Sequence, residues 1–188
     1  RLLERTLPEN IALQVRYAPD GAYLLKGDAT RILQALMNLA VNARDAMPDG
    51  GQLRIEVTRL PPTGAVIPGQ PSGGWLRITV ADSGVGIPAG VLERIFEPFF
   101  TTKAAGQGTG LGLSQVYSIV QEHNGVIDVS STPGAGTTFT LELPALTDYG
   151  LSADGQPGEA ALIRGENEQL LLVEDDATVR HTLLEALE

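Results

Sequence analysis

The chain has 188 residues, a formal net charge of −10 at pH 7 and a hydrophobic content of 43%. This length and composition predict one globular domain of ordinary size with a small additional segment. The acidic excess argues against non-specific binding to nucleic acid or to anionic membranes, so local geometry must hold any bound anion. The chain has no cysteine, which excludes disulfides, thiolate metal sites and cysteine nucleophiles. No apolar run approaches the roughly 20 residues of a membrane-spanning helix.

The first part of the chain predicts a strand followed by a helix. Apolar residues alternate with polar or small ones over 11–17, which indicates a strand with one buried face, and a turn then leads to an expected hairpin with residues 22–26. Asp28 stands at a predicted N-cap position. Residues 30–47 are apolar nearly all round and predict a mostly buried helix.

The rest of the chain predicts two more pairs of strands, separated by loops and a second long helix. In chain order these elements are strands 53–57 and 76–80, a short helix at 89–96, a helix at 109–123, and strands 126–130 and 138–143. This order predicts an α+β fold, a two-layer sandwich in which helices cover one face of a mixed, mainly antiparallel sheet. The predicted organisation is the end of a preceding helical region (1–8), the main domain (9–144), a linker (145–168) and the truncated start of another domain (169–188).

A polar stripe runs along the predicted helix 30–47. Its residues are spaced 3, 4, 4 and 3 apart and therefore share one face: Arg31, Gln34, Asn38, Asn42 and Asp45. One interpretation is a solvated face. Asn is nevertheless a poor helix former, and stacked carboxamides supply oxygens for Mg²⁺ and N–H donors for phosphate oxygens. The other interpretation is therefore a site for a metal and phosphates.

Residues 82–86 place a carboxylate and two glycines directly after the predicted strand 76–80. One interpretation is a tight turn that needs positive φ at glycine. In the other, Asp82 accepts a hydrogen bond from an exocyclic amine such as adenine N6, while Gly84 and Gly86 let the backbone approach a flat ring. The short string alone does not decide between the two.

Glycines with a period of two open the second long helix. Backbone N–H groups at a helix N-terminus favour phosphate, although a flexible linker is the alternative interpretation. The segment is not a Walker loop, because no Gly-Lys-Ser/Thr follows, and it lacks the preceding strand of a Rossmann motif. The glycines are Gly106, Gly108, Gly110 and Gly112.

Three of the four phenylalanines of the chain stand together in the predicted loop at 96–100. They are either ordinary core residues or a partly exposed patch that docks a partner or anchors a moving lid. Lys103 follows closely and could reach a phosphate group. These two interpretations remain open at the level of the sequence.

Together, these segments resemble the catalytic and ATP-binding domain of sensor histidine kinases, within the superfamily shared with gyrase, Hsp90 and the mismatch-repair ATPases. The resemblance covers residues 9–144 and implies a Bergerat-type fold. Each element is ambiguous alone, but their order makes the set specific. The matching elements are Asn38–Ala43 (N box), Asp82–Gly86 and Gly108–Leu113 (glycine boxes), Phe96–Phe100 (F box) and Gly136–Phe139 (glycine-threonine element).

The resemblance implies binding of ATP and Mg²⁺. By it, Asn38 and Asn42 would bind Mg²⁺ and phosphates, Asp82 would read adenine, and Ile87 and Thr138 would border the ring. A lid would run from Lys103 to Gly112. The full set of expected site residues is Asn38, Asn42, Asp45, Asp82, Gly84, Gly86, Ile87, Thr101, Thr102, Lys103, Gly108, Thr109, Gly110, Leu111, Gly112, Leu113 and Thr138.

One position departs from the superfamily's ATPases, which carry a general-base glutamate where this chain has Asn38. An amide cannot activate water, so the departure favours a histidine kinase over an ATP-hydrolysing clamp of the gyrase or Hsp90 type, which is the alternative function. The kinase would pass the γ-phosphate to a histidine on a separate helical dimerisation domain. His123 and His181 do not stand in such a helix, so we expect no self-labelling.

The end of the chain resembles the start of a response-regulator receiver domain, in which Glu174 and Asp175 would match the acidic pair that binds Mg²⁺. A plain acidic turn is the alternative. The resemblance implies a hybrid kinase, with its own dimerisation domain and a receiver domain as partners. Because the chain starts at Arg1 and ends at Glu188, inside a predicted helix, we expect a piece of a longer polypeptide, located in the cytoplasm without membrane contact.

Overall fold

The computed structural model describes residues 6–18, 23–62, 73–103 and 108–146. Nearly all of the predicted linker and the whole predicted second domain lie outside these ranges, so their boundaries stay predictions. The elements are β1 (Ile11–Tyr17), α2 (Ala29–Ala46), β2 (Gly51–Leu60), β3 (Trp75–Asp82), α3 (Ala89–Leu92), α4 (Gly112–Glu122), β4 (Val126–Thr132) and β5 (Gly136–Pro144).

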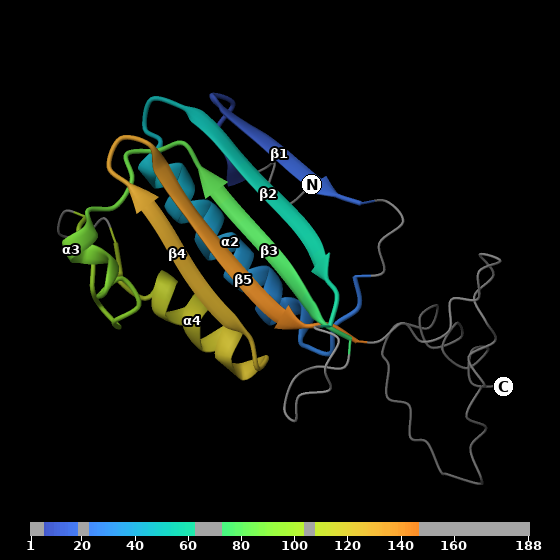
Figure 1. Cartoon of the computed structure of the whole chain (residues 1–188). Helices are drawn as coiled ribbons and strands as arrows, with labels where there is room; N and C mark the ends of the chain where they lie inside the picture. The colour runs from blue at the N-terminus through green and yellow to red at the C-terminus, as the bar shows by residue number, and fades with distance from the viewer. Residues whose placement is uncertain (1–5, 19–22, 63–72, 104–107, 147–188) are drawn as a thin grey trace, which may run out of the picture. The chain divides into compact units, whose positions relative to one another are not determined.

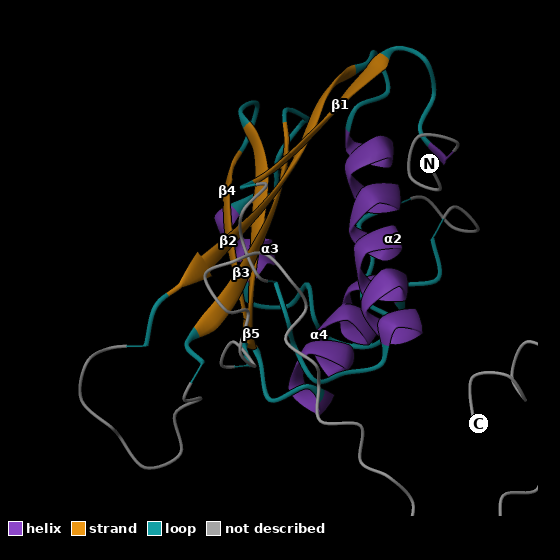
Figure 2. Cartoon of the chain, turned by 90° about the vertical axis from the view of Figure 1, so that its right-hand side faces the viewer, coloured by secondary structure: helices purple, strands orange, loops and turns teal. Residues whose placement is uncertain are grey.

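The strands form a five-stranded sheet in the order β1-β2-β3-β5-β4. β1 runs parallel to β2, and all other neighbours are antiparallel. Helices α2 and α4 lie against one face of this sheet (Figure 1), and the side view separates the layer of strands from the layer of helices (Figure 2). The expected two-layer α+β fold is confirmed.

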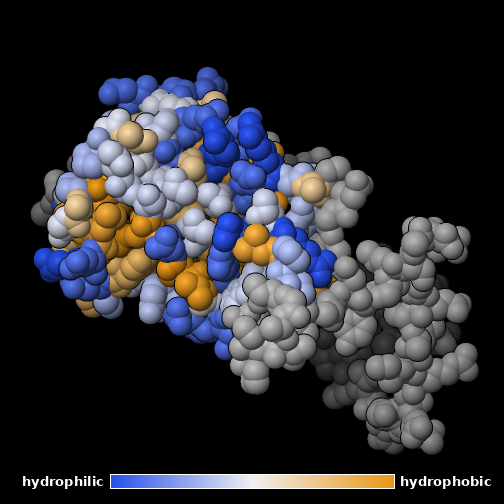
Figure 3. All heavy atoms as spheres, in the orientation of Figure 1, coloured by the Kyte–Doolittle hydropathy of each residue, from blue (hydrophilic) through white to orange (hydrophobic). Residues whose placement is uncertain are grey.

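The core lies between the two layers because side chains alternate along each strand. Small residues on α2 let the helix approach the sheet closely, and α4 adds β-branched side chains. The opposite face of the sheet is largely hydrophilic, with apolar residues reaching the surface around α3 (Figure 3). The core residues include Ala35, Leu39, Ala40 and Ala43 of α2, Val116, Ile119 and Val120 of α4, and Leu53, Ile78, Val80, Phe139 and Leu141 of the sheet.

The ends of both long helices follow local rules. Asp28 caps α2 as predicted, since its carboxylate accepts hydrogen bonds from the backbone N–H groups of Thr30 at 2.8 Å and Arg31 at 3.2 Å. The predicted stop of α4 is also confirmed. Asn124 has a φ of 55°, and the N–H of Gly125 donates to the carbonyl of Val120 at 2.9 Å.

Three local expectations were wrong. Residues 23–26 do not pair with β1, whose neighbour within the described sheet is β2; Leu25 instead forms a single antiparallel bridge with Ala145. The short helix ends at Leu92 rather than 96, where successive turns replace it: Arg94 N–H bonds to the carbonyl of Val91 at 3.0 Å. The second long helix begins at Gly112 rather than 109, because Gly110 adopts a φ of 66° that no α-helix allows.

Candidate functional site

A cavity of about 730 Å³ opens at one end of the sheet, between α2, the N-terminus of α4 and the loops after β3. This size is typical of small-molecule and cofactor sites. The cavity wall contains most of the residues expected from the sequence, and Gly84, Leu111 and Thr138 are the ones that do not line it. Those that do are Asn38, Asn42, Asp45, Asp82, Gly86, Ile87, Thr101, Thr102, Lys103, Gly108, Thr109, Gly110, Gly112 and Leu113.

Asp82, the last residue of β3, presents a carboxylate of fixed orientation to this cavity. Its Oδ1 accepts hydrogen bonds from the backbone N–H groups of Gly84 at 2.8 Å and Thr137 at 3.2 Å. Burial raises the pKa of this carboxyl and outweighs the two hydrogen bonds, which lower it. Both hydrogen bonds go to Oδ1, so Oδ2 remains available to accept a hydrogen bond from a ligand.

The two glycines after Asp82 serve the packing of the chain. A Cβ atom at Gly84 would lie 2.5 Å from the carbonyl oxygen of Ala46, at the end of α2. A Cβ at Gly86, which has a φ of 72°, would lie 2.2 Å from the carbonyl oxygen of Thr132. Their missing side chains face backbone, and Gly86 also lines the cavity; the expectation that both glycines make room for a flat ring stays a prediction.

Thr137, and not Thr138, borders the cavity beside Asp82. Thr137, Phe139 and Leu141 face the helices because side chains alternate along β5, and only the first two line the cavity. Thr138 therefore points to the opposite face of the sheet. Sequence reasoning missed Thr137. The alternation along β5 could have identified it, because Thr137 lies on the same face of the strand as the apolar residues Phe139, Leu141 and Leu143.

The polar stripe of α2 faces α4 and the cavity. Arg31 makes a bidentate ion pair with Glu122 of α4, at 2.8 and 2.7 Å, while Asn38, Asn42 and Asp45 line the cavity. These residues therefore contact α4 or line the cavity, while the interpretation as a site for a metal and phosphates stays a prediction. The stripe joins the two helices at one end and forms a wall of the site at the other.

Asp45 and Lys103 meet at the mouth of the cavity. Lys103 Nζ donates a hydrogen bond to Asp45 Oδ2, and Arg44 Nη2 donates to Oδ1 at 2.8 Å. Partial burial by itself would raise the pKa of the Asp45 carboxyl, but the hydrogen bonds and positive charges of Lys103 and Arg44 together lower it. The loop that carries Lys103 is thus tied to α2.

The glycines before α4 bring the chain past the phenylalanine segment. A Cβ at Gly110 would lie 2.4 Å from the carbonyl carbon of Phe99, and Phe99 N–H donates to the carbonyl of Gly110 at 2.9 Å. Gly112 and Leu113, the first residues of α4, line the cavity. The first N–H groups of a helix have no partner within the helix, so they supply donors and a favourable dipole for an anion.

The phenylalanine segment has two roles. Phe96 packs against the core and contacts Tyr117, with ring centroids 5.5 Å apart. Phe100 lines the cavity with Arg94 stacked 4.5 Å from its ring centroid. Phe99 is 74% exposed and has a φ of 67°. Phe96 thus belongs to the core and Phe99 is exposed, while docking of a partner or anchoring of a lid by this segment stays a prediction.

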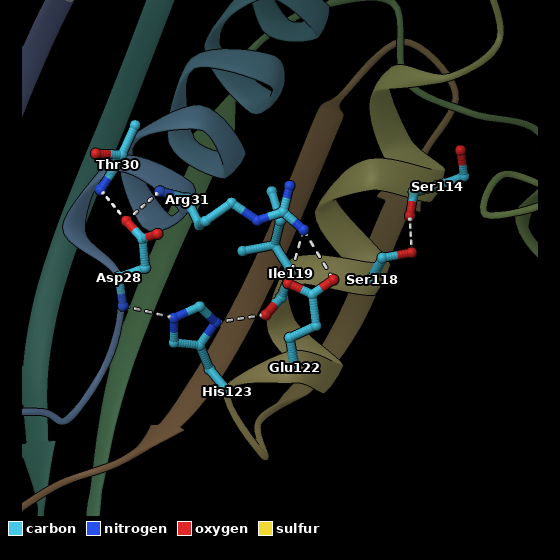
Figure 4. A network of polar contacts seen from close by, with 8 residues as sticks. All are labelled: Asp28, Thr30, Arg31, Ser114, Ser118, Ile119, Glu122 and His123. Atoms are coloured by element: carbon cyan, nitrogen blue, oxygen red, sulfur yellow. Dashed lines mark hydrogen bonds and ion pairs between the residues drawn. The ribbon is translucent and has the colours of Figure 1, made fainter.

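His123 joins α4 to α2 away from the cavity (Figure 4). Its Nε2 accepts a hydrogen bond from the backbone N–H of Asp28 at 3.0 Å, and its Nδ1 lies 2.7 Å from the carbonyl oxygen of Ile119. Since a carbonyl oxygen only accepts, Nδ1 carries the proton. Both ring nitrogens are occupied, which agrees with the expectation that this histidine is structural; His181 lies outside the described residues.

Two kinds of feature are absent from the described ranges. They contain no group of three or more His, Cys, Asp or Glu side chains arranged to hold a metal ion. They also contain no helix with the length and apolar character needed to cross a membrane.

The chain is similar in sequence to known proteins. Residues 27–147 match the family described as "Histidine kinase-, DNA gyrase B-, and HSP90-like ATPase". The whole chain aligns with sensor kinase CckA of Brucella abortus at 41% identity, covering 21% of that protein. Sensor histidine kinase ZraS of Escherichia coli strain K12 is 41% identical over 70% of this chain and 26% of its own length. The chain thus spans about a quarter of these relatives or less.

Solved structures show the same fold. The catalytic domain of histidine kinase ThkA, in a nucleotide-free form, has a TM-score of 0.60 and 34% identity, covering 77% of this chain and 86% of that one. The mycobacterial sensor histidine kinase MprB has a TM-score of 0.62 and 26% identity, covering 78% and 89%.

Proposed function

Because the chain belongs to the histidine kinase-, DNA gyrase B-, and HSP90-like ATPase family, we propose that it binds ATP with Mg²⁺ and donates the γ-phosphate within a two-component sensor kinase. The similar proteins named above are sensor kinases, which are protein kinases. The phosphate acceptor would be a histidine on a helical dimerisation domain of the same protein.

The position of the Asp82 carboxylate is the main support for the proposal that the cavity binds adenine. Its Oδ1 is occupied by two backbone donors, and Oδ2 is left at a cavity whose wall also holds the apolar side chains of Ile87 and Phe139. A flat, apolar ring with an exocyclic amine fits this combination, since the amine would donate to Oδ2. The hydroxyl of Thr137 is bonded to Ser131 at 2.9 Å, which keeps that side chain in place beside Asp82.

The other end of the cavity suits the phosphates. Asn38 and Asn42 offer amide groups, α4 offers its first N–H groups, and Lys103 offers a positive charge that is now paired with Asp45. This set of donors fits a magnesium-bearing triphosphate, with Asn38 and Asn42 as the residues that would hold the cation. Bound Mg²⁺ would neutralise charge on the phosphate oxygens.

The residues of the cavity favour phosphate transfer over hydrolysis. Its carboxylates within the described part of the chain are Asp82, which is held by backbone donors, and Asp45, which is held by Lys103 and Arg44. Neither is placed as a free base for water, and Asn38 is an amide. The ATP-hydrolysing clamp, the second candidate function, lacks a comparable observation in its favour.

The remaining parts of the proposal concern the longer protein. The dimerisation domain and a response-regulator receiver domain would be the partners of this domain, and a hybrid arrangement would follow if residues 169–188 begin a receiver. The domain would act on the cytoplasmic side, where ATP is available, without contact to nucleic acid or membrane.

The proposal is tested by titrating the chain with a fluorescent ATP analogue. We expect Asp82→Ala to weaken binding about 10- to 100-fold, the range for a lost hydrogen bond to a charged group. The control is Asp128→Ala, which removes an exposed carboxylate on β4 and should leave the affinity unchanged. Incubation with γ-labelled ATP should give no phosphate on His123 or His181. Equal affinities for wild type and Asp82→Ala would contradict the adenine assignment.

A further inference from the structure

The side-chain amide of Asn38 has only one orientation compatible with its contacts. Its Nδ2 lies 3.3 Å from the carbonyl oxygen of Gly112 and 3.1 Å from Oε1 of Gln115, both on α4. A backbone carbonyl oxygen can only accept a hydrogen bond, so the NH₂ group, and not the oxygen, must face α4. Because Asn38 donates, Gln115 must accept, so its side-chain oxygen Oε1 faces Asn38.

This orientation limits what Asn38 can offer to a ligand. Both of its N–H groups are used by α4, so Oδ1 is the group left for the cavity that the residue lines. An amide oxygen is a ligand for a hard cation and not a donor to phosphate. Asn42, by contrast, has no side-chain hydrogen bond within the described residues, and its Nδ2 lies near Gly112.

We propose that Gln115 is a positioning residue that holds the Asn38 oxygen toward the magnesium ion of the bound nucleotide. This inference rests on the proposed function and deepens it. Gln115 is exposed and does not line the cavity, so it acts through Asn38 rather than on the ligand. Without the Gln115 acceptor, one N–H of Asn38 loses its partner, and only the longer contact with the Gly112 carbonyl, at 3.3 Å, still holds the amide, so its oxygen is less firmly oriented.

The contact between Gln115 and Asn38 is not needed to join the two helices. The helices α2 and α4 are already joined by the bidentate pair of Arg31 with Glu122 and by the hydrogen bond between Asp28 and His123. Figure 4 shows both of these links. They hold the helices at the end away from the cavity, whereas the contact of Gln115 with Asn38 lies beside it.

The test is the ratio of nucleotide dissociation constants measured in EDTA and in excess Mg²⁺, with a fluorescent ATP analogue as probe. Gln115→Met keeps the length of the side chain and removes the acceptor; we expect the ratio to fall about 10-fold, as for other changes beside a metal ligand. The affinity in EDTA should stay within about twofold, because binding without the cation does not use the Asn38 oxygen. Gln115→Glu keeps an acceptor, so its ratio should not fall below that of wild type.

Gln121→Met is the matched control, since Gln121 lies on the same helix and its side chain donates to the carbonyl of Gly125, at 3.4 Å, and makes no other hydrogen bond with the described residues. The inference is overturned if Gln115→Met keeps the wild-type ratio, if it weakens binding equally with and without Mg²⁺, or if it fails to fold. A wild-type ratio near 1 overturns it as well. Complete absence of nucleotide binding by the wild type would instead refute the proposed function itself.

Discussion

Lys103 donates a hydrogen bond to Asp45, which links the loop after the phenylalanine segment to the last turns of α2 at the mouth of the cavity. Both side chains are partly exposed, at 35% and 27%. Lys103 is the one positively charged residue of the loop 101–103, and its charge is paired with Asp45. Under the proposed function, a phosphate entering the cavity would therefore compete with Asp45 for Lys103.

Asp45→Asn should strengthen the binding of ATP measured in EDTA. The change removes a negative charge from the cavity mouth and frees Lys103, and partly exposed ion pairs of this kind imply a gain of about twofold to fivefold. Asp49→Asn is the control, because Asp49 is exposed in the turn after α2 and does not line the cavity. A weaker affinity for Asp45→Asn would mean that the carboxylate itself contacts the ligand.

The pH dependence of nucleotide binding should reflect Asp82. Its pKa is raised by burial above the ordinary value of 3.8, so the carboxylate takes up a proton at a higher pH than an exposed Asp. Protonation would remove the proposed acceptor for the adenine amine, and nucleotide affinity should therefore begin to fall at a pH above 3.8 and decrease further as the pH drops toward that value. Comparing the pH profile with that of Asp82→Asn separates this effect from titration of the phosphates, since the variant retains only the latter.

The same raised pKa predicts opposite effects of Asp82→Asn on stability and binding. A carboxylate with a raised pKa is less favourable in the folded than in the unfolded state at neutral pH, and the neutral amide removes that cost while its oxygen can still accept from Gly84 and Thr137. Thermal unfolding without ligand should occur at an equal or higher temperature. ATP affinity should nevertheless fall about 10-fold or more, because an NH₂ group replaces Oδ2. A loss of stability would contradict this account of Asp82.

Gly84→Ala should destabilise the domain. The added Cβ would lie 2.5 Å from the carbonyl oxygen of Ala46, where backbone must shift, and we expect a loss of about 1–3 kcal/mol in the free energy of unfolding. Gly90→Ala, within α3, meets nothing within 4 Å and should be neutral or slightly stabilising. Urea unfolding of the two variants gives the comparison, and equal stabilities would show that the contact at Ala46 relaxes freely.

Leu39→Ala tests the packing of α2 on the sheet. Leu39 is 1% exposed, and its truncation should cost about 2–5 kcal/mol in the free energy of unfolding. Leu33 on the same helix is 42% exposed, so Leu33→Ala should change stability by no more than about 0.5 kcal/mol. Urea unfolding of both variants measures the difference, and a small effect at Leu39 would place α2 differently from the structure described here.

Features with a local cause could be predicted from the sequence. The cap at Asp28, the stop at Asn124 and the alternating strands depend on neighbouring residues, and all were found. The polar stripe of α2 was also recognised, because a helix places residues 3 and 4 apart on one face. That periodicity gave the position of Asn38 beside the cavity.

Features that depend on distant contacts were missed. No local signal shows that β1 pairs in parallel with β2, further along the chain, and the hairpin expected with residues 22–26 was wrong. The pairing of Lys103 with Asp45 and the contact of Gly84 with Ala46 join segments far apart in the chain. Thr138 was chosen in place of Thr137 because the motif was read without the alternation of β5.

The most direct test of the central claim is a titration of the wild-type chain with ATP and with GTP in the presence of Mg²⁺. If Oδ2 of Asp82 accepts a hydrogen bond from the adenine amine, ATP should bind about 10-fold or more tightly than GTP. Guanine has a carbonyl oxygen where adenine has this amine, and two acceptors facing each other cannot form a hydrogen bond. Asp82→Ala should remove most of this preference. Equal affinities for the two nucleotides, or no binding of either, would contradict the account.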